Sequence, residues 1–382
     1  MYIGINIILL IKNYFYNLSP FLLMDWVDEL GKIVKVSNGK DEGPARWKIT
    51  AIPQTYAELR DVIKFANEKK LSIYPFSFNM HHIGPPVSID IGVKLSQFNN
   101  VVEISDDDLY VTSQVGVRVS DLFEIIKAKG LFLPAYYDGS LGGLLATNLP
   151  TPFSSFYGYP KNLILMAKVI TGDGIIAKGG GKTLKFSSGY KIHKILSGML
   201  GWLGIYLEAT LKIYPFPEVI VTFQTDKVNL TSKYRPISII YETDEKGDKT
   251  YVTFIGFRRA IEKIGEEIGA KGEDGFYSID YTSDEKVISI HTVRGKEVDV
   301  IRKAKSIMRV KRGIGIVGTG YCRLEVASFD NLEVLRREID EQVVVERGYY
   351  NGDYWGIRDK ETLQMLKEAF DPNNILQPGL IL

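Results

Sequence analysis

Three segments between Pro134 and Pro217 decide the fold of this chain: GSLGGLLATN (Gly139–Asn148), FYGYPKNLILMAKVITGDGIIAKGG (Phe156–Gly180) and SGYKIHKILSGMLGWLGIYLEATLKIYP (Ser188–Pro215). They predict two glycine-rich turns that flank a long strand pair, with a helical piece before the second turn. The glycine pairs in these turns indicate backbone that approaches a neighbour closely or takes a positive φ. Neither turn matches GxxxxGK[ST], or GxGxxG between a strand and a helix, so the usual nucleotide folds are excluded.

Composition limits the class of protein. A chain of 382 residues predicts two domains. The 47 Lys and Arg balance 46 Asp and Glu, which argues against a nucleic-acid partner. The single cysteine, Cys322, excludes an internal disulfide and an all-cysteine iron–sulfur site, and it favours a reducing, cytoplasmic location. The four histidines form no HxH or HExxH pattern, so we predict no metal.

Residues 1–23 are predicted to be a leader. Their apolar run, Ile5–Ile11, is far shorter than the roughly 20 residues that a membrane span needs, and no basic residue precedes it. The favoured interpretation is an extended start, a disordered leader or a partner-packing leader, with a signal or anchor as the alternative. The start codon is Met1 or Met24.

A first domain is predicted over residues 24–218. Residues 47–53 read as an edge strand because they end in proline, and Thr55 with Glu58 predicts a capping box for the helix that follows. With the strand at 71–76, this helix makes a βαβ unit and hence a parallel sheet. A later helix is predicted to start at Ser120 and to turn Leu122, Ile125 and Ile126 toward the core. Further strands are predicted at 88–92, 99–104, 109–115 and 205–213, the second and third as an antiparallel pair.

Residues 219–345 predict an α+β cap domain because strands and helices are mixed there. A ferredoxin-like fold is one arrangement that this mixture allows. We expect strands at 219–223, 237–241, 251–257 and 313–317, and helices at 259–268, 297–308 and 331–340. No internal sequence repeat is visible. Residues 346–382 form a tail with a helix and a rigid turn at Pro378–Gly379.

The order of these motifs resembles the FAD-binding domain of the vanillyl-alcohol oxidase (PCMH) type. The resemblance is carried by Ser140-Leu141-Gly142-Gly143, Tyr157-Gly158, Gly189-Tyr190, Gly201-Trp202-Leu203-Gly204-Ile205 and Leu211–Pro215. The tail FDPNNILQPG resembles the family's FDPxxILNPG, with Gln377 and Leu380 departing from it. The resemblance implies an α+β protein: a two-lobed FAD-binding domain, built from both ends of the chain, with the cap inserted.

The resemblance also implies where FAD would lie. One wall of the site would be the loop after the strand at 71–76. This loop holds three glycines in most of the family but only Gly84 here, as in the smaller FAD-binding subunit of glycolate oxidase. The implied cofactor residues are Pro75, Ser77, Phe78, Asn79, Met80, His81, Gly84, Ser140, Gly142, Gly143, Thr147, Gly158, Gly201, Gly204 and Ile205.

Oxidation of a 2-hydroxy acid needs a cationic fork for the carboxylate and a base near neutral pKa. Arg323 and His81 are the candidates. The alternative for Arg323 is a surface arginine paired with Glu325 or another acid. For His81 the alternatives are packing, solvent exposure or a covalent flavin link. His193 and His291 are interpreted as structural.

The sequence leaves two main functions open, and it also allows a third. The first is an FAD-dependent dehydrogenase subunit that oxidises glycolate or lactate, by hydride transfer from Cα to flavin N5. It would work with an iron–sulfur subunit and a second FAD subunit, and sit at the membrane periphery only through them. The second is a non-catalytic FAD-binding or assembly subunit, which the histidine-free segment Arg347–Gly356 favours. The third is a sugar or lactone oxidase with covalent flavin.

Overall fold

The computed structural model describes residues 26–182, 192–226, 234–283 and 285–382. The predictions for the leader and for Gly189-Tyr190 fall outside these ranges. Within them, no helix combines the length and the apolar character that crossing a bilayer requires.

A four-stranded sheet opens the fold, in the order β1 (Lys35–Lys40), β2 (Ala45–Ile52), β4 (Val87–Lys94) and β3 (Ile73–Phe76). β2 and β3 both run parallel to β4. α2 (Tyr56–Lys69) connects β2 to β3, which gives the predicted βαβ unit. Thr55 caps α2 by accepting a hydrogen bond from the backbone of Glu58, as expected. The edge-strand prediction for residues 47–53 is wrong, because β1 pairs with β2 on its outer side. Pro53 lies beyond the last paired residue, so it removes no hydrogen bond from the ladder.

The second sheet holds β5 (Val101–Ser105), β6 (Tyr110–Gln114), β10 (Gly204–Lys212), β8 (Ile164–Thr171) and β9 (Ile176–Gly180), in that order. The predicted antiparallel pair is β5 and β6. Around this sheet lie α3 (Val119–Lys127), α4 (Leu141–Thr147), α5 (Ser154–Tyr157), α6 (Pro160–Leu163) and α7 (Ile192–Ile195), with a short pair of β7 (Leu131–Phe132) and β11 (Tyr214–Pro215).

Three local predictions in this region need correction. α3 begins after Arg118, with Ser120 inside its first turn, because the Val119 amide donates to the Gly139 carbonyl and fixes the start earlier. Ile125 is 42% exposed, so it does not face the core. The Gly142–Gly143 segment is the first turn of α4, capped by Ser140, and it is not a loop turn. Neither of these two glycines takes a positive φ. Position 142 favours glycine because a Cβ there would lie only 3.0 Å from Val115.

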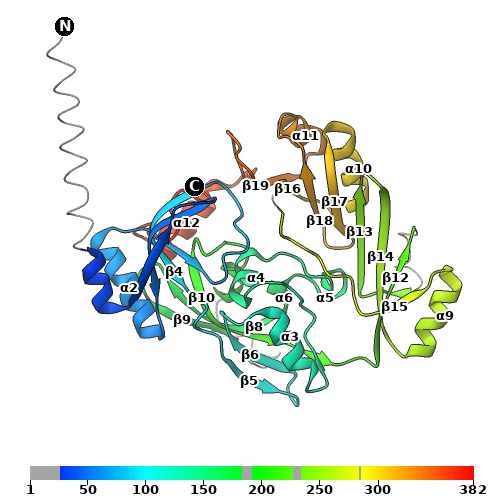
Figure 1. The fold of residues 1–382 in the computed structure, drawn as a ribbon, viewed down its shortest axis with the longest axis horizontal. Helices are drawn as coiled ribbons and strands as arrows, with labels where there is room; N and C mark the ends of the chain where they lie inside the picture. The colour runs from blue at the N-terminus through cyan, green and yellow to red at the C-terminus, as the bar shows by residue number, and fades with distance from the viewer. Residues whose placement is uncertain (1–25, 183–191, 227–233, 284) are drawn as a thin grey trace, which may run out of the picture.

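The cap, at the right of Figure 1, is built on one eight-stranded antiparallel sheet. Its order is β15 (Gly272–Asp274), β12 (Val219–Thr225), β14 (Gly247–Gly256), β13 (Ser238–Asp244), β17 (Val310–Ile316), β18 (Tyr321–Val326), β16 (Lys286–His291) and β19 (Gln342–Arg347). Numbered along the chain, each half has the strand order 4-1-3-2, and the halves join through β13 and β17. That is the ferredoxin-like order, repeated in the described residues although the sequence shows no repeat.

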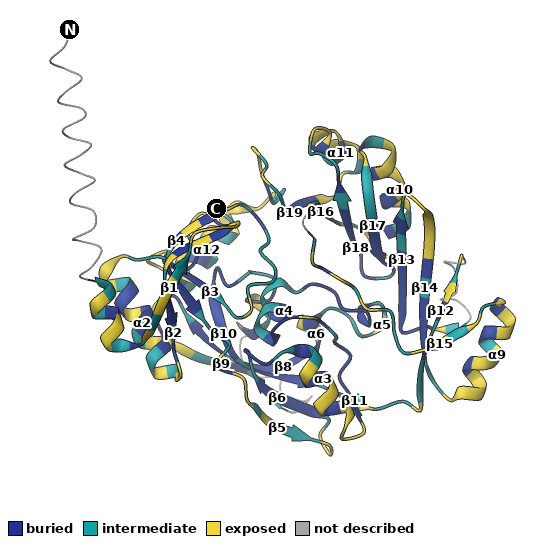
Figure 2. Ribbon diagram, viewed as in Figure 1, coloured by how far each residue is buried: buried dark blue, intermediate teal, exposed yellow. Residues whose placement is uncertain are grey.

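The described helices of the cap lie on the outer face of this sheet. α9 (Arg258–Ile268) packs on the first half, and α10 (Glu297–Ile307) and α11 (Leu332–Ile339) pack on the second. The outer surfaces of these helices are exposed, whereas most of the strands beneath them are buried (Figure 2). The inner face, which carries Ile314, Ile316 and Tyr321, shares a hydrophobic core with the first two sheets.

The tail returns to the first sheet and is fixed there by a buried ammonium group. After α12 (Lys360–Phe370), the Ile73 amide donates to Ile375 O and the Gln377 amide to Ile73 O. Lys367 Nζ donates three hydrogen bonds of 2.7 Å, to Trp202 O, Leu376 O and the Asp371 carboxylate. This set of contacts, the Lys367 cluster, joins α12 and the tail to the segment before β10.

Replacing Lys367 with methionine should therefore destabilise the fold. The Asp371 carboxylate is fully buried and would lose its cation, and breaking such a pair costs about 3–5 kcal/mol. Chemical denaturation should show a loss of that size. Lys360→Met, at the exposed start of the same helix, should change the free energy of unfolding by less than about 0.5 kcal/mol. Equal losses in the two variants would contradict this account of the tail.

Candidate active site

A deep groove of about 890 Å³, including its solvent-open part, lies where four distant segments meet. Its walls are the end of β3 with the loop after it, the start of α4, the residues around the start of β10, and the tail. A groove of this size suits a large organic ligand.

Most of the cofactor residues implied by the sequence line this one groove: Pro75, Ser77, Phe78, Asn79, Met80, His81, Ser140, Gly142, Gly143, Thr147, Gly201, Gly204 and Ile205. Gly84 and Gly158 lie elsewhere. Gly84 packs beneath Trp355, where a Cβ would come within 2.4 Å of the ring, and Gly158 sits at the end of α5 against Asn162. Both have positive φ values, +105° and +82°, so their conformation accounts for the glycine.

The loop from Phe78 to Ile83 lines the groove and has unused backbone donors. Among the described residues, none of its six amides donates a hydrogen bond, whereas the next amide, that of Gly84, donates to Glu346 O. Asn79 takes a left-handed conformation with φ of +52°. Successive amides around a left-handed residue form a concavity for anions. The loop thus fits a pyrophosphate without the family's three glycines.

On the opposite wall, the two glycine amides are not available as donors. The amides of Gly142 and Gly143 are already bonded to Val115 O and Ser140 Oγ. A Cβ on Gly143 would meet nothing closer than Ser140 Oγ at 3.3 Å, so its remaining side opens to the groove. The backbone at Gly143 can therefore approach a flat ligand closely.

Gln377 is a groove residue that the sequence reasoning missed. Its side-chain amide donates to Leu200 O at 2.6 Å, which ties the tail to the turn containing Gly201. Gly201 itself has a φ of +80°, and a Cβ there would lie 2.8 Å from Pro75. The departure from the family's usual asparagine at Gln377 was the available signal, because the longer side chain reaches this carbonyl.

The two adjacent histidines have different environments. His82 contacts Pro85 O through Nε2 at 2.8 Å and Tyr74 Oη through Nδ1 at 3.3 Å. A carbonyl can only accept, so Nε2 carries the proton and Nδ1 accepts from Tyr74. His81 instead forms a cluster with the rings of Tyr137 and Tyr281, lines the groove, and forms no hydrogen bond within the described ranges. Burial, followed by the charge of Arg323, lowers the pKa of His81, which favours the neutral base.

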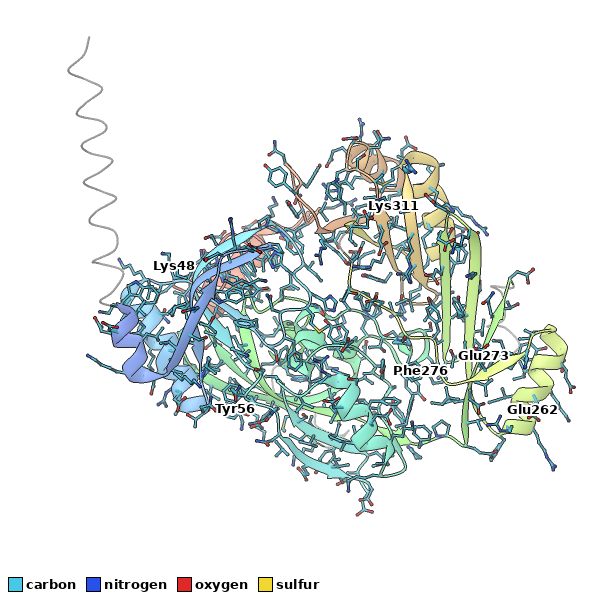
Figure 3. All side chains as sticks on the ribbon, in the orientation of Figure 1. Lys48, Tyr56, Glu262, Glu273, Phe276 and Lys311 are labelled. Carbon is cyan, nitrogen blue, oxygen red and sulfur yellow. The ribbon has the colours of Figure 1, made fainter. Side chains whose placement is uncertain are left out.

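The cap closes over His81 through the segment after β15. Phe276 of this segment packs edge-on against Phe123, Tyr136 and Phe153 of the first domain, and Figure 3 labels it between the two parts. Further along, the Tyr281 hydroxyl donates to Pro150 O. These contacts fix the cap above the loop.

A smaller cavity of about 300 Å³ joins the groove beneath the cap and contains both catalytic candidates, His81 and Arg323. Tyr281 and Glu346 also line it. Arg323 is only 5% exposed, so the alternative of a surface arginine is wrong. Its Nε donates to Glu346 at 3.1 Å and one terminal nitrogen to Tyr281 O at 2.8 Å, while Glu325 lies 3.8 Å away. Burial raises the pKa of Tyr281 well above its ordinary value, so this hydroxyl stays protonated.

Comparison with known proteins indicates the cofactor. Residues 47–180 match the family model described as "FAD binding domain", so the chain contains an FAD-binding domain and FAD is its cofactor, as predicted. The fold is similar to that of alkyldihydroxyacetonephosphate synthase, with a TM-score of 0.60, 15% identity, and coverage of 87% of this chain and 77% of that one. This likeness agrees with the predicted two-lobed FAD-binding domain plus an α+β cap.

Two curated relatives are informative. D-lactate dehydrogenase of Archaeoglobus fulgidus is 30% identical over 208 residues, which are 50% of this chain and 47% of that protein. Glycolate oxidase subunit GlcD of Bacillus subtilis is 23% identical over 411 residues, covering 86% of this chain and 87% of the relative. The chain thus spans about half the length of the D-lactate dehydrogenase, and nearly all of the glycolate oxidase subunit. These matches confirm the predicted resemblance to FAD-linked oxidases.

Replacing Gly143 with leucine should abolish FAD binding while leaving the fold intact. The side chain would fill the groove, and leucine is a better helix former than glycine. We expect FAD affinity, followed by quenching of flavin fluorescence, to fall at least about ten-fold. Gly31→Leu, at an exposed helical glycine away from the groove, is the matched control and should bind normally. Full flavin occupancy in the Gly143 variant would show that the cofactor does not pass this wall.

Proposed function

We propose that this protein is an FAD-dependent oxidoreductase of small 2-hydroxy acids, acting as part of a glycolate oxidase-like or D-lactate dehydrogenase-like enzyme. The observation that carries the proposal is the junction of two cavities at His81. The groove for the cofactor and the smaller cavity under the cap share His81, His82 and Ile83 in their linings. Both ring nitrogens of His82 have hydrogen-bond partners, whereas His81 has none among the described residues. The relatives named above act on D-lactate or belong to glycolate oxidase, which supports the substrate class.

The chain's own residues divide the chemistry as follows. FAD, when bound, supplies the two-electron oxidation. Neutral His81 accepts the proton of the substrate hydroxyl, and the cation of Arg323 attracts the carboxylate. Tyr137 and Tyr281, whose rings both pack against His81 and against each other, hold the imidazole in place and limit the access of water.

A second candidate function is an FAD-binding subunit without its own substrate. Arg323 already donates hydrogen bonds to Glu346 and Tyr281 O, and this favours the second candidate. The relative that covers most of this chain is itself named as a subunit, so an iron–sulfur subunit and a second FAD subunit remain part of the proposal.

Anaerobic reduction of the purified, FAD-loaded chain tests these functions. The proposal predicts that D-lactate or glycolate bleaches the visible flavin absorbance, while L-lactate does so far more slowly. Bleaching that requires added partner subunits would favour the second candidate. A flavin retained in the protein pellet after acid precipitation would instead support the covalent alternative.

His81→Gln provides the matched variant for this reduction. Loss of the base should slow bleaching by about 10²–10⁴-fold without releasing FAD. In the unchanged protein, the rate should depend on neutral His81. Because burial lowers the pKa of His81, the rate should stay constant near neutrality and fall only below the ordinary histidine value of about 6.5. An unaltered rate in His81→Gln would exclude this residue as the base.

A further inference from the structure

Glu346 is a buried acidic side chain in the cavity where we propose that the substrate's carboxylate binds. Its side chain is 7% exposed and lines both the cavity under the cap and a second, outer cavity of about 580 Å³. One carboxylate oxygen accepts from Arg323 Nε at 3.1 Å and the other from the Tyr321 hydroxyl at 2.8 Å. The backbone carbonyl of Glu346 also accepts from the amide of Gly84, which ties this residue to the cofactor loop.

Arg323 has little capacity left for a ligand while Glu346 is bound. Tyr281 O accepts from one terminal nitrogen, and the other lies 3.8 Å from the Glu325 carboxylate. A guanidinium binds a carboxylate best as a two-pronged fork, and here a protein carboxylate takes one of those prongs. An incoming anion would also face the negative charge of Glu346 in a poorly solvated cavity, where like charges repel strongly.

We propose that Glu346 is a specificity-determining residue that occupies Arg323 in place of the substrate's carboxylate. A small acid binds by displacing the Glu346 carboxylate from Arg323. The displaced group keeps its hydrogen bond to Tyr321 and turns toward the outer cavity, which Lys286 and Arg347 also line. This inference rests on the proposed function and deepens it: affinity for carboxylates is set by competition with an internal one.

Oxalate is the probe, because it carries carboxylates and is not oxidised by this chemistry. Its binding to the FAD-loaded protein is followed by the change in the flavin spectrum. Glu346→Gln removes the competing charge and should lower the Kd for oxalate at least about ten-fold. A gain in affinity is a result that structural damage does not produce. The Kd of uncharged glycolamide should stay the same.

Two further variants separate competition from a general change in charge. Glu325→Gln removes an equal charge at the longer contact and should lower the oxalate Kd much less. Tyr321→Phe deprives displaced Glu346 of its remaining partner, so it should raise the Kd, and it keeps the protein measurable should Glu346→Gln fold poorly.

The outcomes distinguish this inference from the proposed function. If the unchanged protein is reduced by a hydroxy acid but Glu346→Gln binds oxalate no more tightly, the inference is overturned and the function stands. Equal effects of Glu346→Gln and Glu325→Gln would likewise overturn it. If no variant binds oxalate and no hydroxy acid reduces the flavin, both proposals fail.

Discussion

The Lys367 cluster is the constraint on which the rest of the structure depends. A buried ammonium group is costly unless all its donors are used, and here each finds an acceptor at 2.7 Å. Trp202 O belongs to the segment before β10, Leu376 O belongs to the tail, and Asp371 directly follows α12. Burial lowers the pKa of Lys367, so the paired carboxylate is needed to keep the amine charged. The tail is thereby held against the segment before β10, beside Gly201.

The cofactor groove follows from this constraint. With the tail fixed, Gln377 reaches Leu200 O and the turn at Gly201 closes against Pro75. The loop after Pro75 is then held on its far side by the amide of Gly84, which bonds to Glu346 of the cap. Between these two anchors its amides remain unpaired. The cap therefore does more than cover the site, because the residue that pairs with Arg323 also holds the cofactor loop.

Much of this architecture could be predicted from the sequence, and the exceptions have physical causes. The family resemblance implied a set of cofactor residues, and thirteen of them line one groove. Strand β1 was missed because KVSNGK lacks an alternating apolar pattern, and its pairing turned a predicted edge strand into an internal one. The start of α3 was misplaced because a distant carbonyl, that of Gly139, and no local cap, determines it.

For the candidate catalytic residues too, the sequence could not reveal what depends on contacts between distant segments. His81 and Arg323 were chosen by residue type, and the structure brings them to one cavity. Neither the role of Glu346 nor the difference between His81 and His82 was visible, because both depend on contacts between residues remote in sequence. The repeated 4-1-3-2 strand order of the cap is likewise a property of pairing, which different sequences can satisfy equally well.

The central claim is that unpaired amides of the loop at residues 78–83 receive the cofactor's pyrophosphate. A crystal structure of the protein with FAD bound tests it most directly. The account predicts pyrophosphate oxygens within hydrogen-bonding distance of several of these amides, with Gly143 against the ligand. A pyrophosphate bound elsewhere, with the loop amides still without acceptors, would contradict it.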